Sequence, residues 1–166
     1  MRKSAKEVLD EVKITEIPVD ISKIAAHYGF SVFQIPMDYD ISGMIIASEE
    51  KIQEYDAKKI IIVNREHSKL RNRFTIAHEL GHYFLRGEPQ KCFAHRDMTN
   101  VNNMEERQAN SFASELLMPK EAVERVIKEL EEDGVPMWHW SGFISNRFKV
   151  SGRAAEVRLN KLGYIF

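Results

Sequence analysis

The segment His78–His82 constrains this chain most, because it has the pattern H-E-x-x-H within a stretch of helical periodicity. On an α-helix, residues four apart lie about 40° apart around the axis and about 6 Å apart along it, so His78 and His82 can reach one ion. Glu79 lies about 100° round from His78, beside the pair rather than between its members. This spacing is typical of metal-dependent hydrolases, in which the acid takes a proton from water that the metal activates.

The residues around this pattern predict one helix over residues 68–85. Ile76, Leu80 and Phe84 share a face roughly opposite the histidines, which is the distribution of an amphipathic helix with a buried side. The same letters would also occur in two surface histidines beside a solvated glutamate. The apolar face opposite the pattern favours the metal interpretation.

A catalytic zinc site needs a third protein ligand and leaves a fourth position for water. Glu106 is a candidate, since it lies 24 residues after His82 in a second helix predicted over residues 104–117. Ala109 and Ala113 give that helix a strip of small residues that permits close approach to another helix. Glu105 is a competing candidate for the third ligand, but it lies about 100° round the helix from Glu106, away from the side that carries Ala109. Glu106 fits equally well as a solvated carboxylate at a helix start, so the spacing leaves both interpretations open.

Further residues are candidates for supporting roles. Asn110, one turn beyond Glu106, is placed to accept a hydrogen bond from a ligand imidazole and so fix its tautomer. An oxyanion formed during hydrolysis needs a further donor, and Tyr83, His95 and a backbone N–H group are the candidates. Cys92 and His95 are three residues apart, but we expect them to be ordinary loop residues.

At these residues the chain resembles the ImmA/IrrE family of metallopeptidases. The shared blocks are Arg73–His82, Glu106–Ala113 and Glu115–Pro119, with further similarity at Pro18–Ala25, Val150–Ser151 and Arg158–Leu159. The resemblance implies His78, His82 and Glu106 as zinc ligands, Glu79 as general base, and a gluzincin-like core. It also implies a bacterial or phage/mobile-element regulatory protease, whose substrate is a helix-turn-helix repressor encoded nearby.

The remaining patterns predict an α+β fold, mainly helical, with a small three-stranded antiparallel sheet before the H-E-x-x-H helix. Residues 3–12 and a segment from Asp20 to Gly29 read as helices, and three β-like runs follow at residues 30–35, 41–47 and 59–63. Residues 87–103 lack periodicity and are predicted to form a long loop, placed to act as a lid. Another helix is predicted over residues 120–132.

We expect a metallopeptidase domain at residues 1–135 and a helix pair at residues 136–166, packed on the same domain. The pair has the rhythm of a helix-turn-helix, with Trp138 and Trp140 as expected hydrophobic anchors. From residue 141 on there are five basic residues and one acidic residue, so a DNA-binding tail is the alternative. The charge excess is small, and packing on the core is favoured.

Composition limits location and partners. The formal net charge of the 166 residues is −1, so no general attraction to nucleic acid or to anionic membranes is expected. The single cysteine excludes an intrachain disulfide within these residues, and there is no apolar run of 18 residues. The charged residues at the N-terminus are not expected to form a signal peptide. A soluble, cytoplasmic protein is expected.

Three functions follow in order of preference. The first is a zinc-dependent metalloendopeptidase that cleaves a helix-turn-helix repressor. The second is a repressor-binding module that keeps the zinc for folding and does not cut its partner. The third is a DNA-binding regulator acting through Arg153 and Arg158 of the basic tail. The protease ranks first because only it gives Glu79 a task beside an open metal site.

Overall fold

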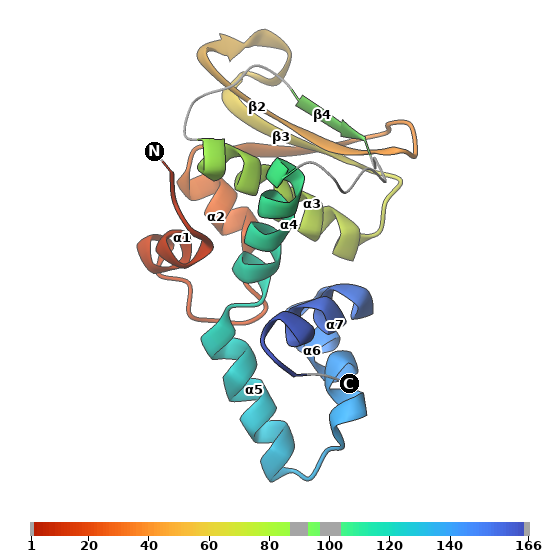
Figure 1. The fold of residues 1–166 in the computed structure, drawn as a ribbon. Helices are drawn as coiled ribbons and strands as arrows, with labels where there is room; N and C mark the ends of the chain where they lie inside the picture. Colours follow the sequence, from red (N-terminus) through yellow and green to blue (C-terminus); the bar gives the residue numbers. More distant parts are fainter. Residues whose placement is uncertain (1, 87–92, 97–103, 165–166) are drawn as a thin grey trace.

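The computed structural model describes residues 2–86, 93–96 and 104–164, with the backbone alone considered for residues 93–96 (Figure 1). The helical elements are α1 (Ala5–Val12), α2 (Ile21–His27), η1 (Gln53–Tyr55), α3 (Lys69–Arg86), α4 (Met104–Leu117), α5 (Lys120–Glu132), η2 (Met137–His139), α6 (Trp140–Phe148) and α7 (Gly152–Lys161). The strands are β1 (Ser31–Ile35), β2 (Ile41–Ile52), β3 (Ala57–Asn64) and β4 (Phe93–Arg96).

The four strands form one mixed sheet in the order β1-β3-β2-β4. The apolar run Ile60–Val63 is buried and places β3 inside the sheet, as expected for a strand covered on both faces. The α+β class is confirmed, but the expected purely antiparallel sheet is wrong, because β1 pairs with β3 in parallel. Since β2 pairs with β3 on one side and with β4 on the other, β1 lies on the remaining side of β3.

The predicted long loop at residues 87–103 contains a strand that the sequence did not indicate. This strand, β4, pairs antiparallel with β2 at the edge of the sheet, where Gly43 lies opposite His95. Four residues are too few for a clear period-two pattern, so only the pairing identifies them as a strand. The rest of that loop, with its expected lid and Cys92, lies outside the described residues.

Helix α3 packs against β2 and β3 of the sheet, and α4 packs across α3 (Figure 1). At the contact with the sheet, a Cβ added to Gly43 would lie 2.6 Å from Thr75 Cγ2 of α3 and 2.7 Å from the Ile62 carbonyl oxygen. Such distances are far below van der Waals contact, so the packing of α3 against the sheet requires glycine at position 43.

Asn64 joins the end of β3 to the segment before β2 and to α3. Its Nδ2 donates to the carbonyl oxygens of Met37, Asp38 and Ile41 at 2.9–3.2 Å, and its Oδ1 accepts from the backbone N–H groups of Met37 and Glu66. The side chain of Asn72 in α3 donates to the Asn64 carbonyl oxygen at 3.0 Å. Asn64 is fully buried, so water cannot reach these backbone groups to replace the hydrogen bonds that its side chain makes.

Replacing Asn64 with Ala is therefore expected to lower the free energy of unfolding by about 2–4 kcal/mol, because buried backbone groups lose their partners. Urea denaturation followed by circular dichroism measures the change. Asn64→Asp is expected to be no better, since a carboxylate cannot donate to three carbonyl oxygens. An unfolding midpoint equal to that of the wild type in both variants would contradict this role.

The C-terminal helices share a hydrophobic core with the rest of the chain, because Ile144, Phe148 and Leu159 belong to the same buried cluster as Leu80 and Leu116. They form the lower group in Figure 1, reached through α5. The two expected tryptophan anchors differ. Trp140 is buried and donates from Nε1 to the Val135 carbonyl oxygen, whereas Trp138 exposes 73% of its surface, so the expectation is wrong for Trp138.

Within the described ranges, none of the helices combines the length and apolar character needed to cross a membrane.

Candidate metal centre

Helices α3 and α4 bring three potential ligands together. His78 and His82 occupy one face of α3, separated by one turn, and Glu106 lies in the first turn of α4. One ligand atom from each of the three residues lies within 4.8 Å of the others. Glu106, which the spacing alone left open, thus faces the histidine pair.

The distances between the ligand atoms fit a tetrahedral metal ion. His78 Nε2 lies 3.2 Å from Glu106 Oε2, His82 Nε2 lies 3.2 Å from Glu106 Oε1, and the two Nε2 atoms are 3.0 Å apart. Ligands about 2.0–2.1 Å from a tetrahedral zinc ion lie roughly 3.3–3.4 Å from one another. Two imidazoles and one carboxylate are also the donor types of catalytic zinc sites with an open position.

Asn110 orients one of the imidazoles. The Nδ1 atom of His78 lies 2.9 Å from Asn110 Oδ1, one turn beyond Glu106 on α4. A carbonyl oxygen only accepts, so Nδ1 carries the hydrogen and Nε2 presents its lone pair to the cluster. This is the arrangement that metal-ligating histidines usually have, with the other ring nitrogen held by a polar group.

The cluster is sheltered on the α3 side and more open on the α4 side. The side chains of His78 and His82 expose 12% and 3% of their surfaces, and that of Glu106 exposes 32%. Glu79, the predicted general base, is fully buried on α3. Glu105 does not join the cluster, because its carboxylate pairs with Arg86 Nη2 at 2.6 Å.

Gly81 permits the two helices to approach, and sequence reasoning missed it. A Cβ added there would lie 3.1 Å from both Cα and the carbonyl oxygen of Ala109, and 3.2 Å from Phe112 Cδ1. Ala109 is itself fully buried, so the predicted small-residue strip of α4 does face α3. A glycine inside a helix lowers stability by about 1 kcal/mol relative to alanine. Its presence inside the predicted helix was therefore the sequence feature that could have indicated a packing role.

Replacing Gly81 with Ala is expected to lower the free energy of unfolding by about 1–3 kcal/mol, because the added methyl group forces α3 and α4 apart. Zinc affinity is expected to fall as well, since Glu106 moves with α4. Gly142→Ala in α6 is the matched control, because a Cβ there meets nothing within 4 Å. The control is expected to gain about 0.5–1 kcal/mol of stability. Equal gains at both positions, with zinc affinity unchanged, would refute the packing role.

The described contacts of the candidate oxyanion donors do not include the ligand residues of the cluster. The Tyr83 hydroxyl accepts a hydrogen bond from Lys59 Nζ at 2.9 Å, and its ring packs edge-on against Phe30. His95 is placed only by its backbone, opposite Gly43, and its side chain lies outside the described part of the structure. Gly43 itself lies against Thr75, one turn of α3 before Glu79.

Two arginines, Arg73 and Arg158, have structural roles. Arg73, near the start of α3, donates to the carbonyl oxygens of Val19 and Lys149 at 3.0 and 3.2 Å. Arg158 is buried in α7 and donates from Nε to the Met118 carbonyl oxygen at 3.0 Å. Burial lowers the pKa of both Arg73 and Arg158, against the opposing effect of nearby acids. A DNA-binding role for the tail therefore lacks one of its two proposed arginines.

Comparison with known proteins gives one family and a set of solved structures. Residues 29–160 match the peptidase M78 family, described as the IrrE N-terminal-like domain. No curated protein matches the chain significantly. Seven chains of solved structures match, among them a Mycobacterium tuberculosis transcriptional regulator with a TM-score of 0.56 and 16% identity. The alignment covers 94% of this chain and 44% of that regulator, so the chain spans less than half of its length.

At 16% identity the structural match shows a shared fold. The family match is more informative, because it covers most of the chain and includes all of the histidine helix and the start of α4. The three blocks of resemblance noted in the sequence lie within the same range. The chain belongs to the peptidase M78 family, as an IrrE N-terminal-like domain.

Proposed function

We propose that this protein is a zinc-dependent metalloendopeptidase. The convergence of His78, His82 and Glu106, with ligand atoms 3.0–3.2 Å apart, is the observation that supports this proposal. Membership of a peptidase family agrees with it. A purely structural zinc site would use four protein ligands, whereas the described residues offer three, which is the number found in catalytic sites.

His78, His82 and Glu106 would hold the ion, and Asn110 would keep His78 in the tautomer that binds it. When bound, zinc supplies Lewis-acid chemistry, lowering the pKa of water and polarising a peptide carbonyl. Glu79 accepts the proton of the attacking water and returns it to the leaving amine nitrogen. Glu79 follows His78 directly on α3, and its burial would keep bulk water from competing for the proton, which supports this role.

The proposed substrate is a helix-turn-helix transcriptional repressor in a bacterial or phage-derived circuit, met in the cytoplasm. Two observations support this choice. The sequence resembles the ImmA/IrrE family, whose members act on such repressors, and one solved structure with the same fold is a transcriptional regulator. The burial of Arg158, one of the two arginines proposed for DNA contact, favours a protein substrate over direct DNA binding.

The test is to incubate the zinc-loaded protein with the helix-turn-helix protein encoded beside its gene and to map new chain ends by mass spectrometry. Discrete fragments that form with the wild type, and not after zinc removal by a chelator, are expected. A stable stoichiometric complex in which the partner stays intact would contradict the protease proposal and support a repressor-binding module. Duplex DNA binding that weakens with salt would instead support a DNA-binding regulator.

A further inference from the structure

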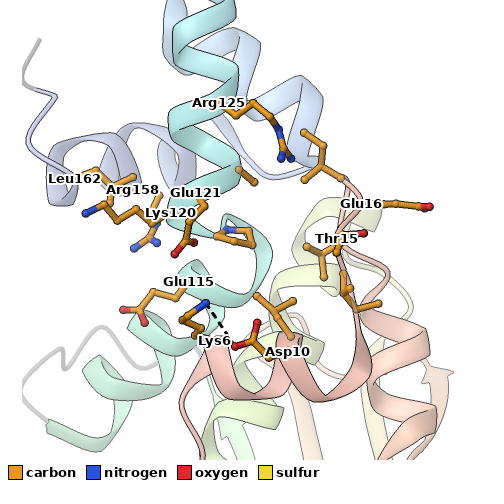
Figure 2. Close-up of a pocket in the computed structure, with 16 residues that line it drawn as sticks. Lys6, Asp10, Thr15, Glu16, Glu115, Lys120, Glu121, Arg125, Arg158 and Leu162 are labelled. Atoms are coloured by element: carbon orange, nitrogen blue, oxygen red, sulfur yellow. Dashed lines mark ion pairs between the residues drawn. The ribbon is translucent and has the colours of Figure 1, made fainter.

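A cavity of about 540 Å³ lies apart from the metal cluster. Its walls come from α1, the 13–19 segment, the junction of α4 with α5, and the end of α7 (Figure 2). His78, His82, Glu106 and Glu79 are not among its lining residues. The volume falls within the range of pockets that hold small organic molecules, so the cavity is large enough to be a binding site.

One part of the cavity is apolar. The side chains that give it this character come from both sides of the seam: Leu9, Ile14, Ile17, Val19, Pro119, Ala122 and Leu162. Leu9 and Val19 are buried, and Ile14, Ile17 and Leu162 remain partly exposed in the cavity wall. Covering partly exposed aliphatic surface of this kind is favourable, so an apolar group is the expected occupant of this part.

Most of the charged residues of the lining are already matched. Lys6 pairs with Asp10 at 3.5 Å, and Lys120 pairs with Glu124 at 3.6 Å. The buried Arg158 donates to a backbone carbonyl oxygen and is attracted by the carboxylates of Glu115 and Glu121. Arg158 therefore helps to build the cavity wall, and its charge is balanced within the protein.

Among the described residues of the lining, Arg125 and Glu16 are the exceptions, and Arg125 is the unmatched cation. Within the part of the chain that the structure describes, its side chain takes part in no ion pair and no hydrogen bond. Figure 2 shows it on α5 with its guanidinium group directed towards the 13–19 segment, while Glu16 of that segment points away. A cation thus lies at the edge of the apolar part of the cavity, and no described acid is within ion-pair distance of it. Its planar donor group suits a carboxylate or a phosphate.

We propose that this cavity binds a small amphipathic organic anion. The apolar body of the ligand lies on Leu9, Ile14 and Ile17, and its anionic group accepts hydrogen bonds from Arg125. Such a ligand contacts α1 and the 13–19 segment on one side and α5 on the other, so its binding stabilises the docking of the C-terminal helices. The site is independent of the metal centre and of peptide cleavage.

Decanoate is a suitable probe, with decanol and decylammonium as its neutral and cationic counterparts. Isothermal titration calorimetry on the zinc-loaded protein is expected to show saturable binding of decanoate, at one site per chain, and much weaker binding of the other two. Arg125→Gln is expected to weaken decanoate binding about tenfold, because the charged hydrogen bonds are lost. Lys128→Gln is the matched control, since Lys128 lies on the same helix outside the cavity and pairs with Glu132.

Ala122→Phe fills the cavity and is expected to abolish binding. Because Ala122 is buried, circular dichroism must show that this variant is folded. Arg125 is exposed, so its variant tests the proposal whatever the outcome for Ala122. Equal affinity for decanoate and decanol, or equal losses in Arg125→Gln and Lys128→Gln, would overturn the assignment, as would absence of binding to the wild type. Loss of cleavage in a Glu79 variant leaves this result untouched, so the two proposals can fail separately.

Discussion

Replacing Glu79 with Gln is expected to lower kcat/KM for peptide cleavage by about 10²–10⁴-fold, the usual contribution of a general base. Glutamine has nearly the same shape as glutamate, so it fits the same fully buried space on α3. Its amide cannot accept the proton that the attacking water must lose. The zinc content should stay at one ion per chain, because the ligand atoms come from His78, His82 and Glu106.

The measurement combines metal analysis with a cleavage assay on the same protein sample. Glu105→Gln is the matched control, since it removes the same charge from a carboxylate that pairs with Arg86 outside the cluster. The control should cleave within about twofold of the wild type, as expected for an exposed ion pair. Full activity in Glu79→Gln would reject the mechanism, and loss of zinc in that variant would show that Glu79 has a structural task instead.

The parts of the site that the sequence predicts are those that depend on one helix. The spacing of His78 and His82 fixes their common face once the helix forms, and the apolar face of Ile76, Leu80 and Phe84 predicts the helix itself. The structure places the helix at Lys69–Arg86 and the next one at Met104–Leu117, close to the predicted bounds. Both predictions use contacts over three or four residues, which a sequence shows directly.

What the sequence did not predict depends on contacts between distant segments. The β-like runs were recognised, but their partners were not, so the parallel pairing of β1 with β3 was missed. Gly43 and Gly81 are required by Thr75 and Ala109, respectively, and neither neighbour is visible in a local pattern. Arg158 looked like part of a basic tail because a sequence shows its charge and not its burial.

Glu106 lies between these two classes. Its helix was predicted from local periodicity, and Ala109 and Ala113 indicated which side of it would approach another helix. Whether that other helix was α3 could not be decided from spacing. In the structure that other helix is α3, because Gly81 of α3 packs closely against Ala109 of α4. This contact sets the separation of the two helices one turn away from Glu106. Completion of the three-residue cluster thus depends on tertiary packing, whereas the histidine pair depends on α3 alone.

This division predicts the effect of removing the third ligand. Glu106→Ala leaves His78 and His82 on α3 with nothing from α4 to complete the site. Replacing a group that only orients a ligand costs about 10–100-fold in metal affinity, and removing the ligand itself should cost more than about 100-fold. Asn110→Ala, which frees His78 Nδ1 but keeps the three ligand atoms, is expected to fall in the smaller range.

Competition with a zinc-binding dye measures these affinities, and zinc-dependent thermal stabilisation gives an independent reading, because an ion that binds only the folded state stabilises it. The expected order of loss is Glu106→Ala, then Asn110→Ala, with Glu105→Ala close to the wild type. Since Glu106 is partly exposed, its removal should leave the apo protein folded, so the loss of zinc can be assigned to the missing carboxylate. Wild-type affinity in Glu106→Ala would show that α4 supplies no ligand, and the peptidase proposal would lose its main support.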